Sequence, residues 1–211
     1  SPRLAQKAAA AGVDAGVAES TDAGGHGSPD GLSTFSLVPQ VVDAVDIPVI
    51  AAGGIADARG LVAALALGAA GVQIGTRFIA TSECNAHAAF KRTLVEAGID
   101  GTAVYCRGYH PSRALRTAAV ARMLEMESQG KTTEEIVAFR GRARARAGCI
   151  EGNLEEGILP AGAAVGLVRS VKSAGDVVRE LVEGCEQVFA ALREALPAER
   201  TSAVPGESDA A

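Results

Sequence analysis

The first half of the chain alternates between short apolar runs and longer amphipathic stretches. The apolar runs at residues 13–18, 47–52 and 71–74 have the length of strands and consist mainly of small and β-branched side chains. Residues 3–11, 35–45 and 57–68 carry the composition or apolar spacing of helices. Short apolar strands joined by helices are typical of a parallel sheet that is buried on both faces, so the sequence predicts an α/β fold.

The segment 47–78 predicts a strand, a helix and a second strand in immediate succession. Asp57 is suited to cap the helix, and Gly68 is suited to end it. Leu61 and Leu65 are expected on its buried face. The rest of the chain is organised around this unit.

A glycine-rich turn follows each strand of this unit, Gly53-Gly54 after the first and Gly75-Thr76 after the second. Glycine lets the backbone approach a ligand closely, and its N–H groups then point at an anion. Barrels of eight β/α units bind phosphate in the loops after strands 7 and 8. The repeated turn therefore favours a phosphate cradle, and the alternative is a pair of tight turns without a ligand.

Residues 19–34 form a loop by composition, at the carboxyl end of the first predicted strand. His26 lies within Gly24-Gly25-His26-Gly27, away from any apolar face. A histidine exchanges protons near physiological pH, so His26 is a candidate general base. A surface histidine without a role is the alternative.

The second half of the chain is expected to be helical, and the 98–116 stretch is left undecided. Helices are predicted at 82–97, begun by Ser82, at 117–129, at 133–146, begun by a capping box of Thr132 and Glu135, and at 174–195. The last helix is expected to bury a stripe of Val177, Leu181, Val188 and Leu192. Arginines at 140, 142, 144 and 146 indicate a solvated helix end, with an anion site as the weaker alternative. The polar tail 197–211 is predicted to be disordered, which leaves 1–196 as the folded domain.

Composition narrows the functional classes. The 211 residues are 48% hydrophobic and 3% aromatic, with a net charge of −5 and no basic stripe, which argues against nucleic-acid binding. There is no apolar run of membrane-spanning length and no signal peptide, so a cytoplasmic protein is expected. The four cysteines show no CxxC pair, so neither a metal site nor a disulfide framework is indicated.

Three segments together carry a resemblance to a known family. IPVIAAGGIAD at 47–57, GVQIGTRF at 71–78 and AGVDAGVAESTDAGGHG at 11–27 resemble the nitronate monooxygenase family of FMN-dependent β/α barrels, with the flavin-dependent enoyl-acyl-carrier-protein reductases as close kin. The resemblance implies the C-terminal part of a TIM (β/α)8 barrel, its last three strands, with additional C-terminal helices. The first five strands would be absent. The family carries Gln where this chain has Ala163.

The resemblance also implies a site and a reaction. His26 would be the catalytic base or its counterpart, and FMN would be bound by Gly24, Gly25, Gly53, Gly54, Gln73, Ile74, Gly75 and Thr76. A nitronate or nitroalkane would react with O₂ to give a carbonyl compound and nitrite. The enzyme could form a homodimer.

Three other functions stay open at this point. The first is an enoyl-thioester reductase that uses NAD(P)H with the same cradle. The second, of another class, is a sugar-phosphate isomerase or lyase barrel without flavin. The third is a barrel fragment that is inactive by itself.

Overall fold

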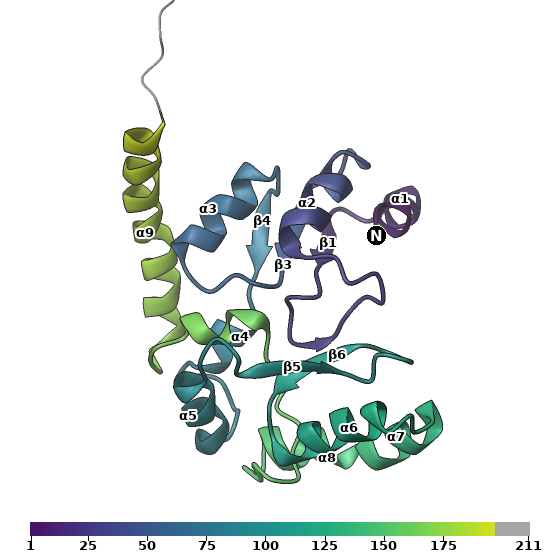
Figure 1. The fold of residues 1–211 in the computed structure, drawn as a ribbon. Coiled ribbons are helices and arrows are strands. Elements are labelled where there is room, and N and C mark those ends of the chain that lie inside the picture. Colours follow the sequence, from purple (N-terminus) through teal and green to yellow (C-terminus); the bar gives the residue numbers. More distant parts are fainter. Residues whose placement is uncertain (197–211) are drawn as a thin grey trace, which may run out of the picture.

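The computed structural model describes residues 1–196 and has a mixed α/β fold (Figure 1). Its helices are α1 (Pro2–Ala10), α2 (Thr34–Val42), α3 (Ala58–Ala66), α4 (Thr76–Ile79), α5 (Ala88–Glu96), α6 (Ala118–Ser128), α7 (Thr133–Arg140), α8 (Ala143–Cys149), the 3₁₀ helix η1 (Ala163–Leu167) and α9 (Ala174–Ala195). Its strands are β1 (Gly16–Glu19), β2 (Gly25–His26), β3 (Val49–Ala52), β4 (Gly71–Gln73), β5 (Thr102–Tyr105) and β6 (Ser112–Leu115).

The predicted parallel sheet is present, with the strand order β1-β3-β4. β1 begins three residues later than the predicted run at 13–18 and extends to Glu19, where it pairs with Ala52. The sheet, α2 and the turns around α3 share one apolar core that includes Val38, Val49 and Ala51. This core positions the carboxyl ends of the three parallel strands side by side.

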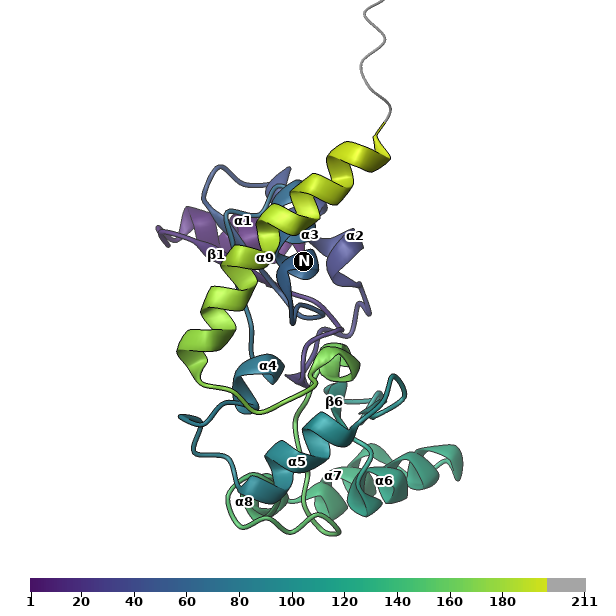
Figure 2. The ribbon, with the colours of Figure 1, turned by 90° about the vertical axis from the view of Figure 1, so that its left-hand side faces the viewer.

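Helix α3 begins as predicted, but it buries a different face. The Asp57 carboxylate accepts hydrogen bonds from the amides of Arg59 and Gly60. Leu65 is 42% exposed, whereas Val62 and Ala64 are buried. α9 runs along α3 (Figure 2), so closely that a Cβ at Gly184 would lie 2.7 Å from the Cβ of Ala58. Small side chains therefore face this helix contact, and the larger leucine is left outside.

A second sheet was not predicted, and the expectation of only three strands followed by helices is wrong. β5 and β6 form an antiparallel hairpin within the undecided 98–116 stretch, and β2 joins the edge of β6. The hairpin lies across the carboxyl ends of the parallel strands, and α6, α7 and α8 lie beyond it (Figure 1). β5 and β6 include Thr102, Ser112 and Arg113, so neither strand forms a continuous apolar run in the sequence.

Two predicted helices have different boundaries in the structure. The capping box of Thr132 and Glu135 is confirmed, but α7 ends at Arg140 and a new helix follows. The break is at Gly141, whose φ of +54° takes the backbone out of helical geometry. α5 starts only at Ala88, with His87 rather than Ser82 as its N-cap.

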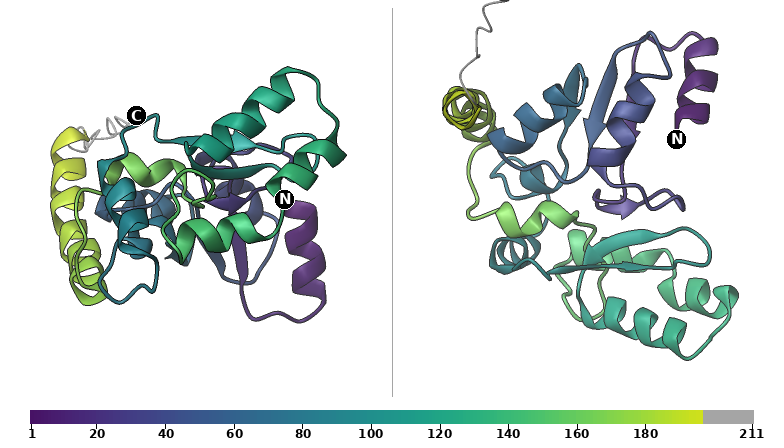
Figure 3. Two further views of the ribbon diagram at one scale, coloured as in Figure 1. Left: turned by 90° about the horizontal axis from the view of Figure 1, so that it is seen from below. Right: turned by 45° about the horizontal axis from the view of Figure 1, so that its top comes forward.

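The long C-terminal helix α9 has the predicted boundaries and its Ser173 cap. Val177 and Leu181 are buried, but Leu192 is 45% exposed, so the predicted stripe covers only the first half of the helix. Figure 3 shows α9 and α1 on opposite sides of the fold. No helix within residues 1–196 is both long and apolar enough to cross a membrane. The tail predicted to be disordered, 197–211, lies outside the described residues.

The outer edge of β1 has no strand partner in the described part of the chain. Val17 in this strand is 52% exposed, and Phe35 at the start of α2 is 74% exposed. An apolar open strand edge is a template for pairing with another strand.

We therefore predict that the 211-residue chain, produced alone, self-associates through β1. Val17→Lys should shift the population toward monomer in sedimentation velocity, because a lysine on an edge strand opposes pairing. Ile99→Lys is the matched control, since Ile99 is 88% exposed but lies outside the strands. An equal shift in both variants would assign the association to general hydrophobicity.

Candidate functional site

A cavity of about 240 Å³ opens at the carboxyl ends of the parallel strands. It is lined by Glu19, Asp22, Ala23, Gly24, Ala52, Gly53, Gly54, Ile55, Gln73, Ile74, Gly75, Thr76, Ile79, Pro160, Gly162 and Ala164. Seven of the eight residues predicted to bind the cofactor are in this lining. Gly25 is not, and neither is His26.

The turn after β3 has a conformation that requires glycine. Gly53 and Gly54 have φ angles of +101° and +74°. A Cβ at Gly53 would lie 2.4 Å from the Oγ of Ser20 and 2.8 Å from the amide nitrogen of Ala23. Gly53 is therefore fixed both by its backbone angle and by the close approach of the loop after β1.

The turn after β4 is open in comparison. Gly75 has a φ of −96°, and a Cβ there would meet no protein atom within 4 Å. Among the described residues, no acceptor is hydrogen-bonded to the amides of Gly53, Gly54, Gly75 or Thr76. Four backbone donors around one cavity suit an anion with several oxygens, such as a phosphate.

Asp22 holds the first loop against this cavity, a role that the sequence did not indicate. Its Oδ2 accepts hydrogen bonds from the Thr34 amide at 2.9 Å, the Thr34 hydroxyl at 3.2 Å and the Ser20 hydroxyl at 3.3 Å. The Thr34 hydroxyl also lies 2.8 Å from the carbonyl oxygen of Gly53, so its single hydrogen is shared between these two acceptors. One carboxylate thus ties the loop after β1, the start of α2 and the glycine turn together.

The far wall of the cavity comes from the segment before η1. The Gly162 amide donates to Thr76 Oγ1 at 2.8 Å, and the Ala163 amide donates to the Asp22 carbonyl at 2.8 Å. Because Thr76 Oγ1 accepts this bond, its hydroxyl hydrogen is left to donate elsewhere. Gly24 packs so tightly here that a Cβ would lie 2.6 Å from the carbonyl carbon of Ala161.

No lysine or arginine lines the 240 Å³ cavity, whereas Glu19 and Asp22 do. Burial lowers the pKa of the Arg113 guanidinium, and the nearby carboxylate of Asp22 opposes this change. A neighbouring open cavity of about 550 Å³ shares Asp22, Gly54 and Ala164 and adds Ala163 and Arg169. An anion in the first cavity would be held by backbone dipoles rather than by side-chain cations.

His26 lies beside this cavity, on the hairpin sheet. It pairs with Ser112 of β6, and its neighbour Gly25 has a φ of +88°, which turns the chain from the cavity to the hairpin. The Nε2 atom of His26 lies 3.0 Å from Nη2 of Arg140. Asp22 and Asp30, each four positions from His26 in the sequence, accept hydrogen bonds from Thr34 and Ser28 instead.

Arg140 also lies against the buried Tyr105. Burial raises the pKa of the Tyr105 hydroxyl, and the guanidinium of Arg140 opposes that rise. The prediction of one basic helix end is wrong, because Arg140 ends α7 and faces the hairpin, whereas Arg144 and Arg146 lie in α8 and pair with Glu156 and Glu151. The predicted solvent exposure is confirmed for Arg142 and Arg146.

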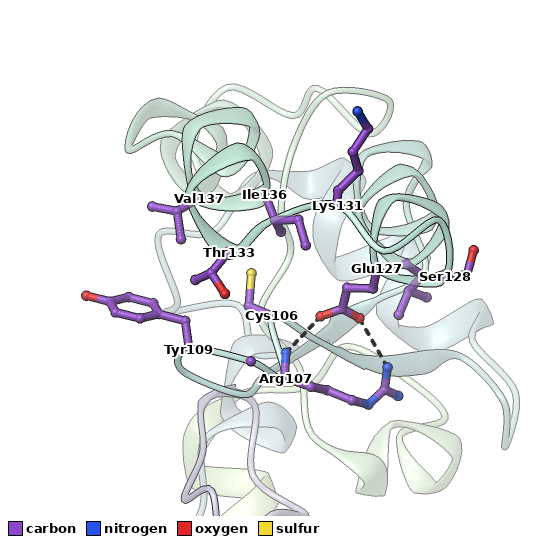
Figure 4. Close-up of a pocket in the computed structure, with 11 residues that line it drawn as sticks. Cys106, Arg107, Tyr109, Glu127, Ser128, Lys131, Thr133, Ile136 and Val137 are labelled. Carbon is purple, nitrogen blue, oxygen red and sulfur yellow. Dashed lines mark hydrogen bonds and ion pairs between the residues drawn. The ribbon is translucent and has the colours of Figure 1, made fainter.

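A third cavity, of about 470 Å³, lies between the β5–β6 turn and helices α6 and α7 (Figure 4). Glu127 accepts from both the amide and the guanidinium of Arg107, at 2.8 and 3.2 Å, so the charge of that arginine is already neutralised. Burial raises the pKa of the Cys106 thiol, which disfavours a reactive thiolate. None of the predicted site residues lines this cavity.

Comparison with known proteins adds a family to this geometry. The family model described as nitronate monooxygenase matches residues 2–184. A curated nitronate monooxygenase of Neurospora crassa is 34% identical over 206 residues, which cover 87% of this chain and 51% of the relative. A Mycobacterium tuberculosis protein named (3aS,4S,5R,7aS)-5-hydroxy-7a-methyl-1-oxo-octahydro-1H-indene-4-carboxyl-CoA dehydrogenase is 34% identical over 84% of this chain and 61% of its own length.

Solved structures show the same fold. FabK from Thermotoga maritima matches with a TM-score of 0.83 and 38% identity, over 93% of this chain and 62% of FabK. Nitroalkane oxidase from Streptomyces ansochromogenes matches with a TM-score of 0.74 and 31% identity, over 91% and 57%. This chain thus spans between about half and three fifths of the length of these relatives.

The glycine geometry predicts a contrast in stability between the two turns. Gly53→Ala should lower the free energy of unfolding by about 2 kcal/mol or more, because it forces a side chain into positive φ and against Ser20. Gly75→Ala should change it by less than about 0.5 kcal/mol. Urea unfolding followed by circular dichroism compares the two, and an equal loss would contradict the close packing at Gly53.

Proposed function

The chain belongs to the nitronate monooxygenase family of flavin-dependent oxidoreductases, and we propose that it is the C-terminal part of an FMN-dependent β/α barrel that oxidises nitronates or nitroalkanes with O₂. The single observation that supports this most is that four residues whose amides have no acceptor in the described chain, from two successive strand ends, line one cavity. Phosphate sites of β/α barrels have this position.

The cavity fits the phosphate end of FMN. Its volume of about 240 Å³ is below the roughly 300–1,000 Å³ of complete ligand pockets. The amides of Gly53, Gly54, Gly75 and Thr76 would hold the phosphate oxygens, together with the hydroxyl hydrogen of Thr76. When bound, the flavin supplies the redox chemistry, and the protein orients the substrate and stabilises charge.

The remaining barrel strands would pair with the exposed edge of β1. The length covered in the relatives and the open edge of this strand both support that arrangement. We further propose that residues 1–196 form the folded unit and that it works within the complete barrel.

His26 is the residue that we propose to contact the substrate. It lies two positions after the cavity-lining Gly24 and outside the cavity itself. His26 would therefore contact the reacting group of a substrate at the entrance of the cavity, and not the phosphate inside it. Gly25 would act as the turn between the two and not as a cofactor ligand.

A flavin-dependent enoyl-thioester reductase that uses NAD(P)H is the second candidate. It is supported by the mycobacterial relative, whose name identifies a CoA thioester as its substrate. Family membership disfavours the sugar-phosphate isomerase, since it implies a flavin.

The proposal is tested on the protein produced with all residues that its reading frame places before Ser1. We expect a yellow protein that releases FMN on denaturation and consumes O₂ with propyl nitronate. Oxidation of NAD(P)H coupled to an enoyl-CoA, without nitronate turnover, would establish the second candidate. A colourless protein would contradict both.

Gly75→Val should abolish FMN binding while leaving the fold intact. The added side chain meets no protein atom within 4 Å of its Cβ position, so it projects into open space at the cradle. Flavin content per folded protein, from absorbance and chromatography, measures the effect. Gly98→Val is the matched control, because a Cβ there also meets no atom and Gly98 does not line the cavity.

His26→Ala should retain FMN but lower kcat/KM by about 10²-fold or more, the usual loss for a positioned base or charge-stabilising donor. Flavin content should be unchanged because His26 does not line the cavity. Unchanged kinetics with nitronates and nitroalkanes would return His26 to the alternative of a surface histidine.

A further inference from the structure

We propose that Arg140 fixes His26 as the neutral tautomer with its proton on Nδ1, so that His26 donates a hydrogen bond to an anionic substrate instead of acting as a base. This inference rests on the proposed function and adds to it a positioning residue, Arg140, that makes the site select the nitronate over the neutral nitroalkane.

The direction of the hydrogen bond between the two side chains follows from their chemistry. Arg140 Nη2 and His26 Nε2 are 3.0 Å apart. A guanidinium has only donors and keeps its charge in proteins, so Nε2 must contribute a lone pair. When Nε2 carries no proton, the neutral imidazole carries its proton on Nδ1. The lone pair of His26 is then occupied by Arg140, and its Nδ1–H is the one donor that the ring can offer to a substrate.

The position of Arg140 is determined by the fold. It is the last residue of α7, and the positive φ of Gly141 ends the helix directly after it. Its guanidinium lies between His26 and the buried hydroxyl of Tyr105. His26 is held in turn by the pairing of β2 with β6 and by the bond from the Gly27 amide to the Pro111 carbonyl at 2.7 Å.

The charge around this pair is not compensated locally. Within residues 1–196, no carboxylate lies within 4.0 Å of the side-chain nitrogens of Arg140, His26 or His110, whereas Arg107, Arg144 and Arg146 each pair with a glutamate. His110 approaches with its ring centroid 6.4 Å from that of His26, and Tyr109 stacks edge-on against His110 at 4.3 Å. One guanidinium and two imidazoles thus form a mouth that attracts anions.

The two substrate forms make different demands on this mouth. A neutral nitroalkane must lose its α-proton to a lone pair, and the lone pair of His26 is engaged by Arg140. A nitronate has already lost that proton, and its negative charge is shared by two oxygens. One of those oxygens can accept from His26 Nδ1–H, on the side of the ring away from Arg140.

The first test reads the tautomer directly, by ¹⁵N NMR of the imidazole rings. The chain has three histidines, and His87 provides an internal reference because its Nδ1 accepts from the Ala89 amide at 3.1 Å, which places its proton on Nε2. We expect the protonated nitrogen of His26 to be Nδ1 and that of His87 to be Nε2, with assignment from single histidine variants. Protonated Nε2 in His26 would overturn the proposal.

The second test separates donor from base by kinetics, in the complete protein. His26→Gln keeps an N–H donor but cannot act as a base, so turnover of propyl nitronate should stay within about 10-fold of wild type.

Arg140→Met should lower kcat/KM for propyl nitronate by at least about 10-fold more than for 1-nitropropane. Arg140→Lys should restore part of the difference, because an ammonium also donates hydrogen bonds. A ratio unchanged in Arg140→Met would overturn the proposal.

Arg142→Met is the matched control, since it removes the same charge from an exposed residue that makes no ion pair in the described chain. An equal effect of both methionine variants would assign the selectivity to overall charge and overturn the role of Arg140. The NMR result does not depend on flavin or turnover. A colourless or inactive protein with protonated Nδ1 would therefore refute the proposed function and retain the tautomer.

Discussion

The close approach of the loop after β1 to the backbone of Gly53 is the contact on which the rest of the site depends. The glycine has no Cβ, so Ser20 and Ala23 can pack against its backbone, and Asp22 and Thr34 then fix that contact with hydrogen bonds. The same loop continues through Gly24, which is packed equally tightly against Ala161. Displacing Gly53 would therefore displace the cavity wall and the path of the chain to His26.

Features that the sequence predicted well are those set by local chemistry. The strands at 47–52 and 71–74 follow from apolar runs that end in glycine, and the starts of α3, α7 and α9 follow from Asp57, Thr132 and Ser173. The glycine turns cluster because carboxyl ends of neighbouring parallel strands share one edge of a sheet. Topology alone thus brought Gly53, Gly54, Gly75 and Thr76 to one cavity.

Features that the sequence did not predict depend on contacts between distant residues. His26 and Arg140 are 114 positions apart, and nothing in either neighbourhood indicates the other. The hairpin of β5 and β6 lacks a clear apolar alternation, because both faces of these short strands are covered by other elements. Without the hairpin, His26 is read as a residue on a flexible loop, whereas strand pairing with Ser112 fixes it.

The distribution of charge separates the two parts of the site. The cradle offers amide dipoles and is flanked by Glu19 and Asp22, whereas the guanidinium of Arg140 lies at the end of α7, against the hairpin. Under the proposed function a phosphate would be bound by those amides, and the charge of Arg140 would be left for the substrate. Under the proposed function the fold would therefore provide two anion sites of different kind, one built from backbone for a group that remains bound, and one built from side chains for a group that must enter and leave.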